Sequence, residues 1–416
     1  MIAKDFKRTR LSCYAAYLSM ASIFSLPPML FITFHEMYGV SYTLLGTLVL
    51  INFCTQLSID LVFSFFSKHF NIKKTVRIMP VLTTIGMVIY ALSPAIFGEN
   101  VYIGLVIGTI IFSVSAGLSE VLLSPVVAAI PGATDKDMSM LHSLYAWGVL
   151  MVVCISSLFF NVFGRENWVY LTLFLAVLPL IACFLFCTSP FPEMNVSHGD
   201  GNAQGKVKNK SKGLLLCVAC IFFGSAAENS MTNWISSYME NALDIPKTVG
   251  DILGMAVFAV LLGVGRTLYA KYGKNISNVL LAGTAGSVVC YLIAGLSSNV
   301  VLSFLACILT GMCTSMLWPG TLILMEEKIP APGVAAYALM AAGGDFGASV
   351  APQLIGVVVD KVAESEAALS LSTTLSMSVE QISMKAGMLT AAIFPIIGVF
   401  LLLFIRKYFN KTKTSA

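Results

Sequence analysis

The chain has 416 residues, of which 57% are hydrophobic and only 11% are charged, with a formal net charge of +4 at pH 7. A soluble domain carries about 25% charged residues, so this composition excludes a water-soluble globule built on one core. It predicts a protein that crosses a lipid bilayer many times.

Runs of about 20 apolar residues are long enough to cross a bilayer, and the chain contains twelve. They are 11–34, 43–67, 75–97, 101–130, 138–162, 167–188, 213–239, 248–270, 277–296, 300–325, 333–360 and 385–406. Between the sixth and seventh runs lies a polar stretch rich in Pro, Gly and Lys, which is typical of a flexible linker. We therefore expect an all-α membrane protein with a six-helix bundle over 1–190, a cytoplasmic linker over 191–212 and a second six-helix bundle over 213–416.

The distribution of Lys and Arg predicts the orientation. Of the 25 basic residues, 21 fall on the side that holds both ends of the chain and the linker, and four fall on the other side. Cytoplasmic loops carry the excess of Lys and Arg, so both termini are expected in the cytoplasm. We expect a monomer in the lipid bilayer of a bacterial plasma membrane. The Ser/Thr-rich outer segment 362–384 is compatible with a short surface helix.

Glu120 lies deep in the fourth apolar run. A carboxylate in the bilayer interior costs several kcal/mol unless it faces a cavity or a partner, so it indicates function. Ser113 and Gly117 share its side of the helix, and Pro125 follows where a helix would bend around a cavity. The pattern predicts a proton-coupling residue; a structural Glu hydrogen-bonded to the next helix is the alternative.

Two further spans carry polar stripes at helical spacing. Asn52, Gln56 and Asp60 follow one another at four-residue intervals in the second span. Asp345 and Gln353 lie on one side of the eleventh span. We interpret both stripes as gating residues, with hydrogen bonding that holds helices together as the alternative.

The candidate solute-binding residues come from the seventh and tenth spans. Asn229, Asn233 and Trp234 lie together in the seventh span, and Thr314 and Trp318 follow one face of the tenth. Amides hydrogen-bond hydroxyl groups, and an indole face suits the apolar face of a sugar ring. The pattern favours a sugar or a sugar-like metabolite as the solute.

Three other residues complete the candidate set. Glu228 is a second carboxylate inside a span and is assigned to proton coupling with Glu120. Trp147, in the fifth span, is the sixth solute-binding candidate. Arg266, at the cytoplasmic end of the eighth span, snorkels to the interface or braces an inner gate; we assign it to gating.

The twelve spans in two sets of six, the basic linker and the short basic loops resemble the major facilitator superfamily. Its signature after the second helix of a half is similar to Gly265-Arg266 followed by Lys271-Tyr-Gly-Lys274, and the loop 67–74 is a degraded copy. The resemblance implies two bundles that give access to a central site from each side of the membrane in turn.

A narrower resemblance is to the fucose-permease-like branch of sugar:proton symporters. Glu120 followed by Pro125, and Ala227-Glu228 with Trp234, are similar to that branch. The branch pairs its fourth-span Glu with an acid in the first span, where this chain has no acid before the outer edge. The resemblance implies proton-coupled sugar symport.

Other functions fit the sequence less well. A proton-driven exporter of a drug or amphipathic metabolite is the main alternative, although the fifth span has no Pro and a single Gly, unlike the exporters of this superfamily. A sensor or an enzyme is disfavoured because the largest loop has 24 residues and no phosphate-binding GxxxxGK[ST] stretch occurs. The ten Cys fall inside spans and the four His do not pair at ligand spacing, so we expect no metal, no cofactor and no nucleic-acid partner.

The predicted topology can be tested by labelling introduced cysteines with a membrane-impermeant maleimide. A Cys at Gly201 should react only from the cytoplasmic face and a Cys at Ser372 only from outside, because the 21-to-4 division of basic residues sets the orientation. Labelling of both positions from one face would contradict the twelve-span arrangement.

Overall fold

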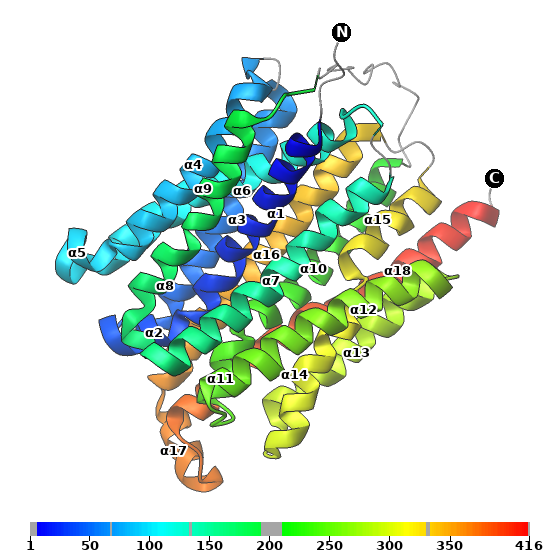
Figure 1. The fold of residues 1–416 in the computed structure, drawn as a ribbon. Helices are drawn as coiled ribbons and strands as arrows, with labels where there is room; N and C mark the ends of the chain where they lie inside the picture. Colours follow the sequence, from blue (N-terminus) through cyan, green and yellow to red (C-terminus); the bar gives the residue numbers. More distant parts are fainter. Residues whose placement is uncertain (1–5, 67–68, 133–134, 193–209, 330–332, 415–416) are drawn as a thin grey trace. The chain divides into compact units, whose positions relative to one another are not determined.

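The structure is a computed structural model that describes residues 6–66, 69–132, 135–192, 210–329 and 333–414, nearly all of them in helices (Figure 1). Its contacts divide the chain into two compact units. The first comprises Met1–Val40 and Ile51–Ser197, and the second comprises Ser41–Leu50 and His198–Ala416. Most of the expected linker lies outside the described residues.

In the first unit, α4 packs against α6 and α9, and α1 packs against α7 and α9 (Figure 1). Pro27 and Pro28 remove two backbone donors near the end of α1, and the axis bends by 47° between α1 and α2. The elements are α1 (Lys7–Met29), α2 (Phe31–Tyr38), α3 (Tyr42–Phe66, whose first turns belong to the second unit), α4 (Ile72–Ala91), α5 (Ser93–Phe97), η2 (Gly98–Asn100), α6 (Val101–Ala128), α7 (Asp135–Phe163), η3 (Arg165–Asn167), α8 (Trp168–Leu175) and α9 (Val177–Thr188).

In the second unit, α10 packs against α16 and α18, and α13 packs against α14 and α18. The short helix α17 lies in the outer segment where the sequence is compatible with one. The elements are α10 (Lys210–Asn241), α11 (Lys247–Val249), the π-helix η4 (Gly250–Ala256), α12 (Val257–Tyr272), α13 (Ile276–Leu296), α14 (Val300–Thr314), α15 (Leu317–Lys328), α16 (Gly333–Ala363), α17 (Glu366–Leu375) and α18 (Val379–Thr414).

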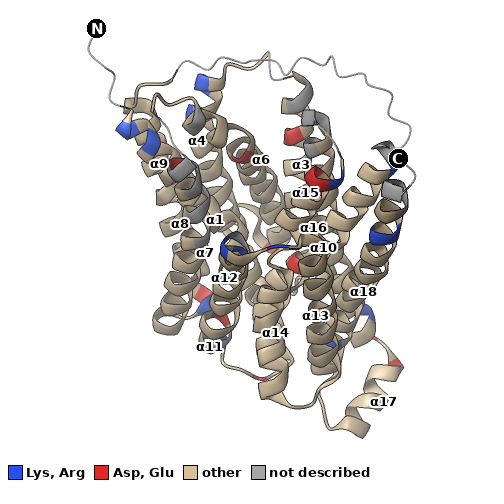
Figure 2. Cartoon of the chain, turned by 90° about the vertical axis from the view of Figure 1, so that its right-hand side faces the viewer, with Lys and Arg blue, Asp and Glu red and all other residues tan. Residues whose placement is uncertain are grey.

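The helices have the length and composition of membrane spans. Within the described part of the chain, nine are long and apolar enough to cross a bilayer, and the bent pair α1–α2 brings the number to ten. The remaining expected spans, 75–97 and 138–162, coincide with α4–α5 and with α7. The all-α membrane fold is therefore confirmed, and the arrangement is consistent with twelve spans. Charged residues gather mostly toward the helix ends (Figure 2).

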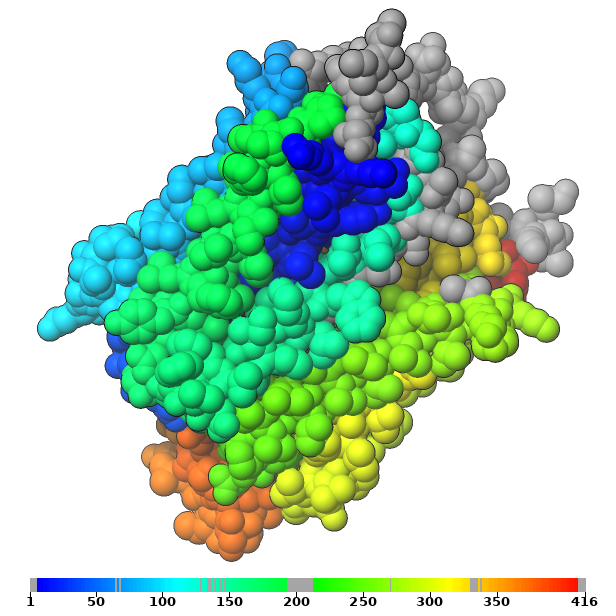
Figure 3. Space-filling model, in the orientation of Figure 1, coloured from blue at the N-terminus to red at the C-terminus, as the bar shows by residue number. Residues whose placement is uncertain are grey.

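Large apolar side chains cover the outer faces of several helices. Tyr170 and Phe174 on α8 are 66% and 60% exposed, and Phe184 on α9 is 68% exposed. These helices are green in Figure 3 and lie on the face that it shows. Exposed apolar area of this kind marks contact with a membrane or a partner, and on helices of spanning length it faces lipid.

One contact between α3 and α16 is so close that only glycine fits there. A Cβ added at Gly356 of α16 would lie 2.2 Å from the backbone oxygen of Tyr42, whereas a Cβ at Gly263 of α12 would meet nothing within 4 Å. Gly356→Ala should destabilise the protein by about 1–3 kcal/mol because α3 and α16 must move apart. Gly263→Ala is the matched control and should be neutral or stabilise by up to about 1 kcal/mol. Thermal unfolding in detergent measures both, and equal melting temperatures would contradict the packing.

Candidate functional site

Two acidic side chains, one on α6 and one on α3, lie beside the same helix contact inside the first unit. Glu120 on α6 lies close enough to Asp60 on α3 for its charge to act on that carboxyl, and it acts also on the Tyr17 hydroxyl of α1. The two helices meet closely at Gly117, where an added Cβ would lie 3.0 Å from the Ile59 Cβ. The sequence predicts Glu120 and Asp60 in separate roles, and the structure brings them together.

Glu120 is accessible to solvent, whereas the residues around it on α6 are buried. Glu120 is exposed in the middle of α6, although its neighbours Leu118, Ser119 and Leu123 are 7%, 6% and 0% exposed. The Asp60 Oδ1 atom is buried, and no donor of the described chain reaches it. No Lys or Arg in the described ranges forms an ion pair with either carboxyl. Two carboxyls close to one helix contact do not both ionise at low cost.

The two other polar residues predicted on this face of α3, Asn52 and Gln56, form hydrogen bonds with each other and with α6. Asn52 Oδ1 accepts from Gln56 Nε2 at 3.0 Å and from Ser113 Oγ at 2.6 Å. All three side chains are buried. Buried amides whose bonds are satisfied hold helices together, so Asn52 and Gln56 fix α3 against α6 two turns and one turn before Asp60. Their gating role stays a prediction.

A second charged group lies in the second unit. Arg266 of α12 forms an ion pair with Glu228 of α10, with 3.3 Å between Nη2 and Oε1. The Arg266 Nε also donates to the backbone oxygen of Ser315 at 3.0 Å. The sequence predicts a proton-coupling role for Glu228 and a gating role for Arg266, and it does not predict their contact. Pro319 is the sequence feature that could have indicated this contact. A proline four residues after Ser315 leaves the Ser315 carbonyl without its helical donor.

The two asparagines of the seventh span use their amide nitrogens within α10. Asn229 Nδ2 donates to the backbone oxygen and the hydroxyl of Ser225 at 3.1 and 3.2 Å. Asn233 Nδ2 donates to the Asn229 backbone oxygen at 2.9 Å. Asn229 is partly exposed and Asn233 is 7% exposed. Both side chains point along one side of the helix, as the four-residue spacing predicts.

Trp234 serves packing in this structure. Its side chain is 0% exposed, and its indole N–H donates to the backbone oxygen of Pro352 at 3.1 Å. Its ring lies beside the Tyr42 ring, with 5.9 Å between the centroids. A fully buried indole offers no face to a solute in this conformation.

The remaining solute candidates differ in exposure. Thr314 is 0% exposed, and its hydroxyl donates to the Thr310 backbone oxygen at 2.9 Å. Trp318 is partly buried beside Gly344, where an added Cβ would lie 2.4 Å from the indole ring. Trp147 on α7 is 63% exposed. Only Trp318 and Trp147 therefore have accessible rings.

The gating candidates of α16 are largely buried. Asp345 is 8% exposed. Gln353 packs against Gly46 of α3, where an added Cβ would lie 2.9 Å from the Gln353 Cα. The Gln353 Oε1 atom is buried and contacts no donor of the described residues. The close contact at Gly46 is the second point, with Gly356, at which α16 touches the first turns of α3.

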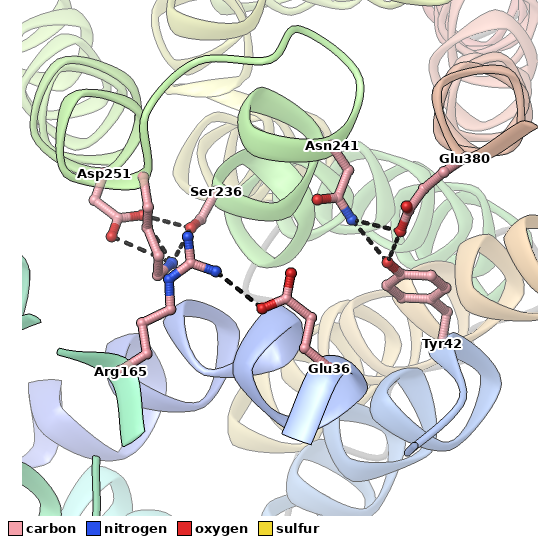
Figure 4. Close-up of polar contacts among 8 residues, drawn as sticks. Glu36, Tyr42, Arg165, Ser236, Asn241, Asp251 and Glu380 are labelled. Carbon is pink, nitrogen blue, oxygen red and sulfur yellow. Dashed lines mark hydrogen bonds and ion pairs between the residues drawn. The ribbon is translucent and has the colours of Figure 1, made fainter. Parts of the chain in front are cut away.

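A polar cluster that the sequence does not predict fixes the start of α3. The Asp360 carboxylate accepts the backbone N–H groups of Tyr42 and Thr43 at 3.0 and 2.6 Å, so a residue of α16 caps α3. The Tyr42 hydroxyl donates to Glu380 at 2.6 Å, and Asn241 donates to both Tyr42 and Glu380 at 2.7 and 2.9 Å (Figure 4). The first turn of α3 is thereby bound to α10, α16 and α18.

A buried ion pair stands beside the π-helix. Lys247 Nζ lies 3.3 Å from Asp251 Oδ2, and both side chains are almost fully buried. The Ser236 hydroxyl donates to Asp251 and accepts from Lys247 at 3.0 Å (Figure 4). Lys247 is one of the four basic residues that the sequence places on the outer side, and the structure buries it with a partner four residues on. Among the described residues, no group of three or more His, Cys, Asp or Glu is arranged to hold a metal ion.

Most of the chain is similar to a known protein family. The family model described as Major Facilitator Superfamily matches residues 13–352. No curated protein sequence matches the chain.

Several solved structures share the fold. A bacterial homologue of the human lysosomal transporter Spinster is 12% identical with a TM-score of 0.74, over 98% of this chain and 99% of that one. The nucleoside transporter NupG is 14% identical with a TM-score of 0.70, over 96% and 99%. A D-xylose-proton symporter is 16% identical with a TM-score of 0.71, over 96% and 97%. At these identities the similarity concerns the fold.

The buried indole of Trp234 gives a test of its packing role. Trp234→Phe removes the donor to Pro352 and part of the ring, and should destabilise the protein by about 1–3 kcal/mol. Trp147→Phe, at an exposed position, should change stability by less than about 0.5 kcal/mol. Thermal unfolding of both variants in one detergent measures the difference. A Trp234→Phe protein as stable as the parent would mean that the indole N–H is not held in the folded state.

Proposed function

The chain belongs to the Major Facilitator Superfamily, and on that premise we propose that it moves a small polar solute, a sugar or sugar-like metabolite, across the membrane together with protons. It is a multi-pass membrane transporter and not an enzyme. The D-xylose-proton symporter and the nucleoside transporter among its structural neighbours support this solute class. A solute gradient or a proton gradient would supply the energy.

The observation that carries the proposal is the carboxyl pair of Glu120 and Asp60. Glu120 is exposed within a membrane-spanning helix, and the nearby Asp60 has a buried oxygen that no donor of the described residues reaches. A proton from water binds Glu120 when the site is open to one side, and it leaves to water when the site is open to the other. Asp60 favours the protonated pair by like-charge repulsion. Asp60 in the second span would thus take the place of the first-span acid found in the fucose-permease-like branch.

The solute would bind along α10 and α15. The partly exposed Asn229 and its neighbour Asn233 supply amide groups for hydroxyls, and Trp318 supplies an aromatic face. Trp234 and Thr314 are fully buried, so we place them behind the site as residues that position α10 and α14. Trp147 on α7 is exposed and remains a candidate contact.

The sequence-based predictions of subfamily, domain bounds, orientation and gating residues are part of the same proposal. We place the protein in the fucose-permease-like branch, with bundles over 1–190 and 213–416 joined by the linker 191–212. The division of Lys and Arg supports a plasma-membrane protein with both termini in the cytoplasm. We propose that it works as a monomer, with Asn52, Gln56, Asp345, Gln353 and Arg266 taking part in gating.

The decisive variant is Glu120→Gln, which imitates the protonated state at all times. In proteoliposomes loaded with sugar, it should still exchange labelled for unlabelled solute. It should fail to accumulate solute when an imposed pH gradient drives transport, because no proton is bound or released. Glu120→Asp should retain part of the accumulation.

Glu99→Gln is the matched control, since Glu99 is an exposed acid in η2, the short helix directly before α6. It should accumulate solute like the parent. If Glu120→Gln accumulates as well as Glu99→Gln does, Glu120 is a structural residue and the coupling acid lies elsewhere. Solute that moves against the protons, into the compartment that the protons leave, would support the drug or metabolite exporter.

A further inference from the structure

The guanidinium of Arg266, a partly exposed side chain of the second unit, lies beside a carboxyl within a membrane-spanning helix. It lies 3.3 Å from Glu228 Oε1, and the Arg266 and Glu228 side chains are 44% and 16% exposed. Arg266 is near the end of α12, whereas Glu228 lies in the middle of the long helix α10. The side chain therefore reaches from the end of one helix toward the middle of another, where a charge is costly without a partner or a ligand.

Two features of the backbone hold this guanidinium in place. Pro319 has no N–H, so the Ser315 carbonyl at the break between α14 and α15 lacks its helical donor, and Arg266 Nε donates to it at 3.0 Å. Gly265 lets α12 approach that break, because an added Cβ would lie 2.2 Å from the Ser315 Oγ. The plane of the guanidinium is thus fixed before any ligand arrives.

The contacts leave most of the donors of Arg266 unused. A guanidinium has five N–H groups in a rigid fork, and two of them serve Ser315 and Glu228. No acceptor in the described chain meets the others, including both on Nη1. The Glu228 Oε2 atom is buried and without a hydrogen-bond partner among the same residues. The pair is fixed in place but incompletely satisfied.

We propose that Arg266 binds an oxyanion group of the transported solute, so that the solute is an acidic sugar derivative with a carboxylate or a phosphate. The planar fork matches both groups in a bidentate manner. Glu228 occupies part of the fork when the site is empty and competes with the ligand when it fills. This inference rests on the proposed solute transport, narrows its substrate class, and adds solute binding to the gating role proposed for Arg266.

The test compares ligands that share one ring and differ in charge. Binding of D-galactose, D-galacturonate and D-galactose 6-phosphate to the purified protein is measured by titration calorimetry in detergent. One of the acids should bind about ten- to a hundred-fold more tightly than galactose, the size of a charge-assisted hydrogen-bonded pair. The two acid arms decide between carboxylate and phosphate. Equal affinity for galactose and both acids overturns the inference.

Variants separate recognition from packing. Arg266→Gln should remove the preference for the acid, and Glu228→Gln should raise acid affinity several-fold because the competing carboxylate is gone. A merely structural pair would lose affinity for all ligands in both variants. Arg165→Gln is the matched control, since Arg165 also pairs with a glutamate, Glu36, at 3.3 Å (Figure 4), and it should keep the preference. A preference that survives Arg266→Gln, or falls in Glu228→Gln, overturns the inference.

Failure of this inference is distinguishable from failure of the proposed transport. Proton-driven accumulation of neutral galactose without an acid preference would leave the proposed function standing and remove the role of Arg266. Acid binding that depends on Arg266, together with a Glu120→Gln protein that accumulates solute normally, would support the anion site and remove the coupling role of Glu120.

Discussion

The structure depends on the low polarity of the bilayer, in which every buried charge or backbone polar group needs a partner or an opening to water. Charged side chains accordingly gather toward the helix ends, and the few within the helices are accounted for in different ways (Figure 2). Lys247 and Asp251 neutralise each other in full burial. Glu120 lies exposed near Asp60 and forms no ion pair with a cation of the described residues, and Arg266 pairs with Glu228 through one contact. The two incomplete arrangements are the ones to which we assign function.

Small residues determine where these groups meet. Gly117 lets α6 approach α3 beside Glu120 and Asp60, and Gly265 lets α12 approach the helix break that anchors Arg266. Gly46 and Gly356 allow the contact of α3 with α16. Close approach of backbones is the main source of helix association in lipid, because apolar side chains gain little there by leaving the solvent. Both polar sites therefore stand beside a contact that a small residue makes possible.

Prolines and helix ends supply the remaining polar contacts. Pro319 leaves the Ser315 carbonyl to Arg266. At the start of α3, the Ser41 hydroxyl accepts the Leu44 N–H, and Asp360 of α16 accepts the N–H groups of Tyr42 and Thr43. A helix end or a proline creates an unpaired backbone group at a known position. At both positions a side chain from another helix satisfies such a group and also orients that helix.

The sequence by itself determined the class of the fold, the helical segments and the individual polar residues inside them, because apolar length, composition and four-residue spacing are local properties. Glu120, Asp60, Glu228 and Arg266 are all visible as costly residues in apolar runs. Only the tertiary structure decided that Glu120 meets Asp60, that Arg266 meets Glu228 and that Trp234 is buried. Those contacts join residues of different helices, and their partners depend on the rotation and depth of each helix. Packing sets these quantities, and no periodicity within one segment encodes them.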